Sequence, residues 1–67
     1  MDLSEEFILE LTQVQQRLFG FLFKRLADRE QAREVLQRTN LVLCRKADNY
    51  ELGTNFKAWA MSVANYE

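Results

Sequence analysis

Apolar side chains recur at every third or fourth position through the first part of the chain, which is the spacing of an amphipathic helix. The positions on this stripe are Leu3, Phe7, Leu11, Val14, Leu18, Phe21 or Leu22, and Leu26. Asp2 with Glu5 three residues later forms a capping-box pattern at the predicted start. Ile8, Phe19 and Phe23 widen the stripe past one face. We therefore expect this helix to be central in a bundle or to dock against another surface.

A second helical pattern begins after a break near residues 27–28. Asp28 is followed by Gln31, which is again a capping-box pattern. The positions predicted to face inward are Ala32, Val35 or Leu36, Thr39, Leu43 and Ala47. Arg45 and Lys46 fall in the last turn, where positive charge complements the helix dipole.

Residues 48–55 are rich in turn formers and predict a loop. Thr54 or Asn55 can cap a third helix, and one side of that helix presents Phe56, Trp59, Ala60 and Val63. This pattern is still helical at Glu67, so we expect the domain, residues 1–67, to be truncated at its C-terminal end. The predicted fold is all-α, a small antiparallel bundle of three main helices.

Composition limits what such a bundle can do. The chain has 67 residues, 48 % of them apolar, and a domain of this size has a marginal core. The lone Cys44 can form no disulfide within the chain, and without histidine no closed zinc site is expected. We predict no metal, no cofactor and no enzymatic activity, because Cys44 has no base beside it and no glycine-rich phosphate loop exists.

Charge and hydropathy bear on location and partners. Four acids and no base occupy the first ten residues, unlike a signal peptide, and purely apolar runs reach only four residues. We therefore expect a cytoplasmic protein without a membrane segment. The net charge of −1 does not indicate a nucleic-acid binder. However, residues 11–57 hold all nine Lys and Arg against five acids, so a basic face is an option.

The second helix carries a polar surface at helical spacing. Its members are Glu34, Gln37, Arg38 and Asn40, with Leu41 and Cys44 beside them. Such a face can simply be solvated. Asn40 is unusual, because asparagine is a poor helix former that needs a specific hydrogen bond in a helix interior. The mixture of amide, charge and exposed leucine favours a docking surface.

Aromatic and amide side chains gather near the C-terminal end. They are Tyr50, Asn55, Phe56, Lys57, Trp59, Asn65 and Tyr66. Together they could stack on unpaired bases and hydrogen-bond to them. Alternatively, Phe56 and Trp59 are core anchors of the bundle. Packing accounts less readily for Tyr50, Asn55 and Asn65.

Two segments resemble a known family. Residues 32–43, Ala-Arg-Glu-Val-Leu-Gln-Arg-Thr-Asn-Leu-Val-Leu, are similar to the region 2 pattern of sigma-70 factors. Residues 50–65 look like that family's aromatic-Gly-Asn-Phe sequence followed by Ala-Trp and Ala-Asn. The compact spacing is closest to the extracytoplasmic function (ECF) type, and the resemblance covers residues 7–66. It implies a bacterial transcription initiation factor.

The resemblance also implies roles for individual residues. Glu34, Gln37, Arg38 and Asn40 match positions that contact the clamp helices of the largest subunit of core RNA polymerase, and Leu41 and Cys44 border that contact. The loop 48–55, with Tyr50 and Asn55, matches the segment that holds a base flipped from the promoter −10 element. Phe56, Lys57, Trp59 and Asn65 match the melting helix that captures the single-stranded non-template strand.

Further partners and one alternative follow. An anti-sigma factor is a partner class of the family, and the apolar excess at Ile8, Phe19 and Phe23 indicates a homodimer or another partner surface. Arg33 and Arg38 stand where the family usually has acids. Because the family continues into a basic stretch beyond this chain, we expect weak DNA binding by these residues alone. The alternative function is a helical protein–protein interaction module without a DNA role.

Overall fold

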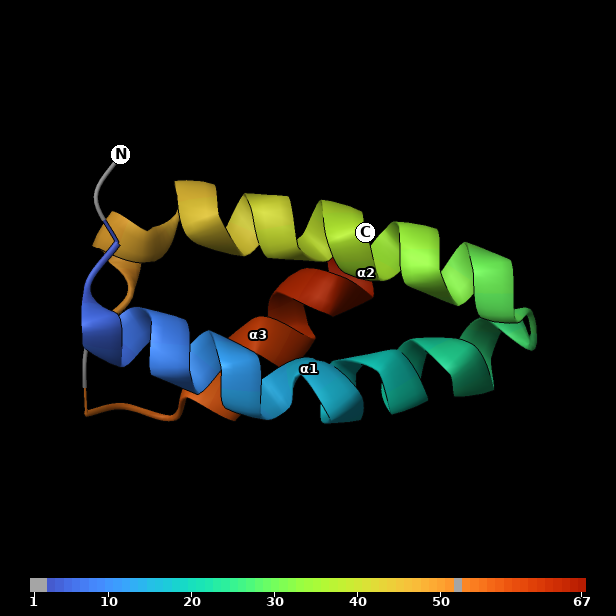
Figure 1. Cartoon of the computed structure of the whole chain (residues 1–67), viewed down its shortest axis with the longest axis horizontal. Coiled ribbons are helices and arrows are strands. Elements are labelled where there is room, and N and C mark those ends of the chain that lie inside the picture. Colours follow the sequence, from blue (N-terminus) through green and yellow to red (C-terminus); the bar gives the residue numbers. More distant parts are fainter. Residues whose placement is uncertain (1–2, 52) are drawn as a thin grey trace.

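In a computed structural model, which describes residues 3–51 and 53–67, the chain forms three α-helices and one short 3-10 helix. The α-helices are α1 (Glu5–Leu26), α2 (Arg29–Arg45) and α3 (Phe56–Tyr66), and η1 (Ala47–Asn49) follows α2 directly. Helices α1 and α2 lie side by side and antiparallel, and α3 crosses behind them (Figure 1). The predicted all-α bundle is confirmed. None of the described helices is both long enough and apolar enough to traverse a lipid bilayer.

Each α-helix begins at a side chain that accepts a hydrogen bond from the first turn. Ser4 Oγ accepts from the Phe7 backbone N–H at 3.0 Å and caps α1. The sequence predicted Asp2 for this position; Asp2 lies outside the described residues, and the helix starts after Ser4. The other two predictions are confirmed, with Asn55 chosen over Thr54: Asp28 caps α2 and Asn55 caps α3. Short polar side chains at these positions are worth about 1 kcal/mol each.

The turn between α1 and α2 depends on one unusual backbone conformation. Ala27 ends α1 with φ 53° in the left-handed region, and its N–H donates to the Phe23 carbonyl at 2.8 Å. This bond satisfies a carbonyl that the helix end would leave free. The chain then reverses within two residues, which places α2 alongside α1 and brings residues 25 positions apart into contact.

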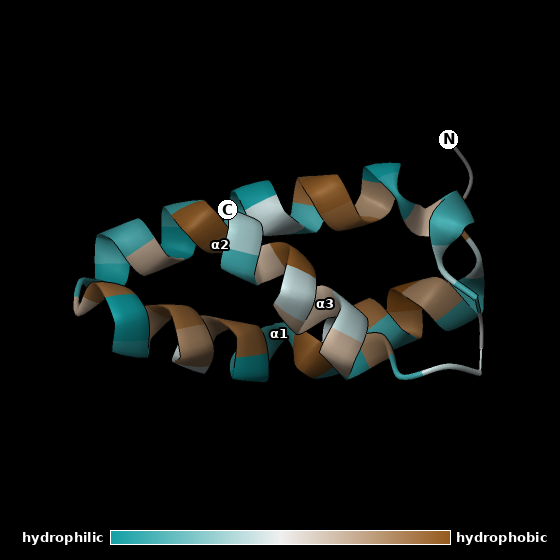
Figure 2. Ribbon diagram, turned by 180° about the vertical axis from the view of Figure 1, so that it is seen from behind, coloured by the Kyte–Doolittle hydropathy of each residue, from teal (hydrophilic) through white to brown (hydrophobic). Residues whose placement is uncertain are grey.

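The core lies where α3 covers the α1–α2 pair. Its buried residues are Phe7, Val14, Leu18, Leu22, Ala32, Thr39, Leu43, Tyr50, Phe56, Ala60, Val63 and Ala64. The predicted stripe of α1 is therefore confirmed, with Leu22 rather than Phe21 inside. Val35, Leu36 and Ala47 are only half-buried. In Figure 2 the apolar colouring of α1 and α2 extends past the strip that α3 covers.

Four aromatic rings form a cluster at the N-terminal ends of α1 and α3. Phe7, Tyr50, Phe56 and Trp59 lie within ring-centroid distances of 4.9 to 6.3 Å of one another, mostly edge to face. Edge-to-face pairs are worth about 0.5–1.5 kcal/mol beyond the area they bury. This cluster joins the loop after η1 to both α1 and α3. The interpretation of Phe56 as a core anchor is confirmed, and Trp59 is half-buried against the same core.

Candidate functional site

The polar surface predicted on α2 contains a shallow hollow. Gln37, Asn40, Leu41 and Cys44 line this hollow, which has a volume of about 330 Å³. Leu41 is 59 % exposed, and by helical spacing Gln37 and Leu41 lie opposite the buried Thr39 and Leu43. We call these four residues the α2 hollow. The structure therefore brings together four of the six residues that the sequence grouped on this helix.

The other two members of the group extend the same face. Glu34 and Arg38 are exposed, and each lies one turn from a residue of the α2 hollow, Glu34 from Gln37 and Arg38 from Leu41. Among the described residues the ion pair on α2 joins Arg33 to Glu30 at 3.9 Å, and both side chains are mostly exposed. Such a pair contributes little to stability. The face thus combines amide, charged and apolar groups, which suits a protein interface.

Asn40 is held by a partner on the neighbouring helix. The Asn40 Nδ2 donates to Gln15 Oε1 at 2.9 Å, and Gln15 Nε2 donates to Asn40 Oδ1 at 2.9 Å. The Gln15 Nε2 also donates to the Leu11 carbonyl at 3.0 Å. The sequence correctly indicated that Asn40 needs a specific hydrogen bond, but it missed Gln15. The available signal was that Gln15 is the one polar member of the four-residue series Leu11, Gln15, Phe19, Phe23.

Three residues predicted to bind DNA have structural roles within the bundle. Tyr50 is 8 % exposed and its hydroxyl donates to the Thr54 carbonyl at 3.0 Å, while Phe56 is 3 % exposed. Asn55 Oδ1 accepts from the Ala58 backbone N–H at 3.0 Å as the cap of α3. The expectation that packing accounts poorly for Tyr50 is therefore wrong, because its ring is buried in the aromatic cluster. Asn55 is exposed and caps α3, as one of the two cap candidates in the sequence.

The remaining predicted DNA-binding residues are accessible. Lys57 and Asn65 are exposed on α3, and Trp59 is half-buried between them in sequence. Asn65 Oδ1 accepts a hydrogen bond from Arg25 Nη1 at 2.6 Å, which joins the C-terminal end of α3 to that of α1. Tyr66, at 88 % exposure, contributes nothing to the core. The structure therefore separates the aromatic cluster, to which Trp59 belongs, from Lys57 and Asn65, which by helical spacing share an exposed face of α3.

Two basic residues that the sequence did not single out, Arg17 and Lys24, lie with Lys57 along the boundary between α1 and α3. Arg17 and Lys57 line two adjoining hollows of about 500 and 440 Å³, and Lys24 lines the second. Gly20 also lines the second, and nothing lies within 4 Å of where its side chain would be. We call Arg17, Lys24 and Lys57 the basic groove. Glu10 is an acid at its far end.

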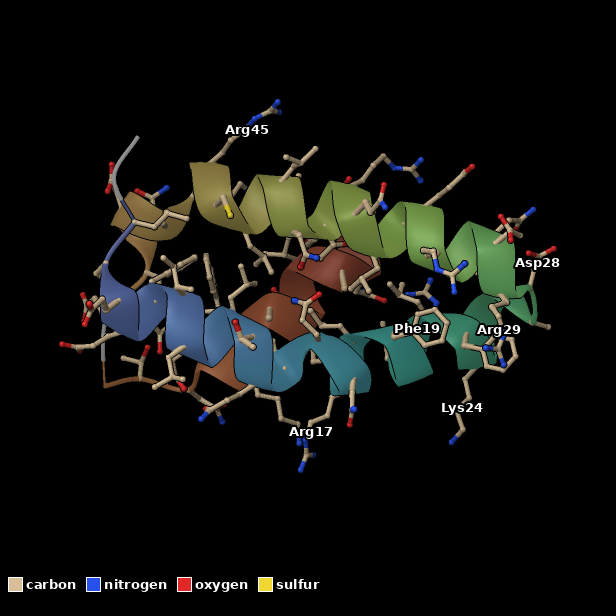
Figure 3. The ribbon with its side chains drawn as sticks, in the orientation of Figure 1. Arg17, Phe19, Lys24, Asp28, Arg29 and Arg45 are labelled. Carbon is tan, nitrogen blue, oxygen red and sulfur yellow. The ribbon has the colours of Figure 1, made fainter. Side chains whose placement is uncertain are left out.

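The basic groove lies on the side of α1 that faces away from α2. Arg17 and Lys24 project from the side of α1 that faces away from α2, whereas Arg45 projects from the opposite edge of the molecule (Figure 3). By helical spacing, Arg17 and Lys24 lie opposite Gln15. The seven-residue spacing of Arg17 and Lys24, which is about two helical turns, could have indicated from the sequence that both lie on one face. Their proximity to Lys57 depends on where α3 crosses α1.

Ile8, Phe19 and Phe23, the apolar residues that widen the stripe of α1, differ in how far other side chains cover them. Helix α1 packs against both α2 and α3, and α2 and α3 also pack against each other. Phe19 and Phe23 stack at a centroid distance of 6.0 Å with their planes 13° apart, and the Arg29 guanidinium lies 5.8 Å from the Phe23 ring centroid. Ile8 and Phe23 remain 47 % and 41 % exposed. Self-association through these residues stays a prediction.

The described residues contain no cluster of three or more histidine, cysteine or carboxylate side chains suited to holding a metal ion. Cys44 is a half-buried free thiol beside Leu41 in the α2 hollow. The described residues present two surfaces, a mixed apolar and amide face on α2 and a basic groove between α1 and α3.

The bundle presents a mixed amide and apolar face on α2 and a basic groove between α1 and α3. The family described as Sigma-70 region 2 matches this chain over residues 11–67, which is 57 of its 67 residues. The chain belongs to this family, as the resemblance predicted, and the family acts in transcription initiation. Neither the curated proteins nor the solved structures gave a match. The finer ECF assignment stays a prediction.

Proposed function

We propose that this domain binds core RNA polymerase through the face of α2 and helps recognise and melt the promoter −10 element. The observation that carries the proposal is the α2 hollow, where Gln37, Asn40, Leu41 and Cys44 converge on the helix that bears the sigma-70 sequence pattern. An exposed leucine between two amides supplies apolar area together with orienting hydrogen bonds. Interfaces of moderate size use that combination.

The polymerase contact is centred on Gln37 and Leu41 in this proposal. Both side chains are exposed, so their removal leaves the core of the bundle intact. Glu34 and Arg38 form the rim of the contact, where charges influence the association rate and the choice of partner more than the affinity. Arg38, at a position usually acidic in the family, adapts this rim to a complementary acidic group on the polymerase.

In this proposal the DNA contact is divided between the basic groove and accessible side chains of α3. Arg17, Lys24 and Lys57 supply positive charge for the phosphates, and phosphate contacts provide most non-specific affinity. Trp59 and Asn65 offer a partly exposed ring and an amide for unpaired bases. Tyr50, Asn55 and Phe56 act indirectly, because they hold the loop and the first turn of α3 in shape.

The decisive experiment is a comparison of two surfaces in two assays. Gln37→Ala combined with Leu41→Ala should weaken binding of the chain to core RNA polymerase by about tenfold or more, since each removes a central contact. Arg17→Ala combined with Lys24→Ala is the matched control, because these side chains lie on another side of α1. The control should bind core enzyme normally and bind single-stranded DNA more weakly.

The outcomes separate the proposal from its rival. If the wild-type chain binds no core RNA polymerase, or if the α2 variant binds as well as wild type, the docking proposal is wrong. A helical protein–protein interaction module without a DNA role would then be the better description. If core enzyme binds but the basic-groove variant loses no affinity for DNA, only the assignment of the groove is overturned.

A further inference from the structure

Gln15 is the residue that links the backbone of α1 to the α2 hollow. One hydrogen of its amide goes to the Leu11 carbonyl at 3.0 Å, and the other goes to Asn40 Oδ1 at 2.9 Å. Its Oε1 accepts from Asn40 Nδ2 at 2.9 Å. Both amide hydrogens of Gln15 are therefore used within the protein. Gln15 was not among the residues that the family pattern assigns to a partner.

The Leu11 carbonyl determines which way the amide pair points. A reciprocal pair of amides could in principle form with both groups flipped, because each amide has a donor side and an acceptor side. The Leu11 carbonyl oxygen, 3.0 Å from Gln15 Nε2, can only accept a hydrogen bond. The NH₂ group of Gln15 must therefore face Leu11. This requirement places Gln15 Oε1 against Asn40 Nδ2 and thereby defines the orientation of Asn40.

Asn40 keeps hydrogen-bonding capacity after this pairing. Its amide has two hydrogens and its oxygen has two lone pairs, and Gln15 uses one of each. The side chain is half-buried and borders the α2 hollow beside Leu41. One donor and one acceptor of Asn40 thus remain for a group that enters the hollow.

We propose that Gln15 is a positioning residue for polymerase docking, which holds the Asn40 amide in the orientation that the partner contacts. The inference rests on the proposed function of the α2 face. Its physical basis is preorganisation: a side chain already fixed in its bound rotamer loses less conformational entropy on binding. Without Gln15 the Asn40 amide rotates freely and can turn its donor edge towards water. The partner group is a polar side chain or peptide group that presents both an acceptor and a donor.

The test is a double-mutant cycle measured as affinity for core RNA polymerase. Gln15→Met keeps the length and the shape of the side chain and removes all three hydrogen bonds. In the chain with Asn40 present, this change should weaken polymerase binding by about three- to tenfold, which is the range expected for immobilising one flexible side chain. In the Asn40→Ala background the same change should have no further effect, because Gln15 acts only through Asn40.

A second readout separates positioning from general destabilisation. Every variant is measured at a temperature where its unfolding curve shows it to be folded, so the affinity reports the interface alone. The two Asn40 side-chain amide protons are also followed by NMR in the free chain. In wild type one of them should exchange slowly with solvent, and in Gln15→Met both should exchange rapidly. A role limited to bundle stability would not change polymerase affinity among fully folded chains.

Three results would overturn the inference in distinguishable ways. Equal weakening by Gln15→Met in both Asn40 backgrounds would mean that Gln15 does not act through Asn40. Normal binding by folded Gln15→Met, while Gln37→Ala and Asn40→Ala bind poorly, would remove the positioning role and leave the docking function standing. If neither Gln37→Ala nor Asn40→Ala weakens polymerase binding, the docking function fails and the positioning role fails with it.

Discussion

Gln15 on α1 and Asn40 on α2 donate one hydrogen bond to each other, both at 2.9 Å, across the seam between the two longest helices. Both side chains are half-buried, where an amide without a partner would be unfavourable. Reciprocal bonding satisfies both side chains and also restricts how far α1 can slide along α2, because a shift of one residue would separate the two amides. The pair therefore defines the register of the helices and shapes the α2 hollow.

Removal of both members of this pair should destabilise the bundle less than the sum of the two single removals. Gln15→Leu alone, or Asn40→Leu alone, leaves a half-buried amide without its partner and should lower the free energy of unfolding by about 1–3 kcal/mol. In the double variant two leucines pack across the seam, and the loss should be smaller than the sum of the single losses. Urea unfolding of the four chains measures this coupling, and strictly additive losses would mean that the amides do not interact.

Thr39 is a buried polar residue whose replacement should stabilise the domain. The side chain is 0 % exposed, and its Oγ1 is the one buried side-chain polar atom in the described ranges without a hydrogen-bond partner. Thr39→Val removes the unsatisfied hydroxyl and retains the branched shape, so the free energy of unfolding should rise by about 1 kcal/mol. Thermal unfolding followed by circular dichroism tests this. A lower melting temperature for Thr39→Val would contradict it.

Tyr50 offers a way to separate the structural role of the aromatic cluster from direct DNA contact. Tyr50→Phe keeps the ring and removes the hydroxyl that donates to the Thr54 carbonyl at 3.0 Å, so stability should fall by about 1 kcal/mol. The fluorescence of Trp59, the only tryptophan, reports the packing of this cluster. Affinity for single-stranded DNA should not change at temperatures where the variant is folded. A loss of affinity without a loss of stability would instead place the hydroxyl against DNA.

The basic groove should reveal itself through the salt dependence of DNA binding. Arg17→Ala and Lys24→Ala each remove one phosphate contact, and each should reduce the slope of log affinity against log salt by about 0.7 for a single strand. Fluorescence anisotropy with a labelled single-stranded oligonucleotide at several salt concentrations measures the slope. Arg45→Ala is the control, because this side chain projects from the opposite edge of the molecule. An equal decrease for Arg45→Ala would indicate general charge attraction without a defined groove.

The sequence by itself determined the three helices, most of their inward faces and the cap at Asp28, and it narrowed the cap of α3 to Thr54 or Asn55. These features depend on neighbours within about four residues along the chain, where periodicity and capping chemistry act. The family could be recognised for the same reason, because its sequence pattern lies within continuous segments of α2 and α3. The sequence also predicted that Asn40 makes a specific hydrogen bond, because asparagine is a poor helix former within a helix.

Only the tertiary structure decided which partner Asn40 takes, where Tyr50 lies and how the basic residues meet. Gln15 and Asn40 are 25 positions apart, and their contact depends on the left-handed turn at Ala27 that folds α2 back along α1. Tyr50 belongs to a loop, and a loop has no periodicity that would indicate burial. The Tyr50 ring packs against Phe7, which is 43 positions earlier in the sequence. Arg17 meets Lys57 only because α3 crosses α1 at that point. Contacts between distant segments follow from packing, which local spacing does not encode.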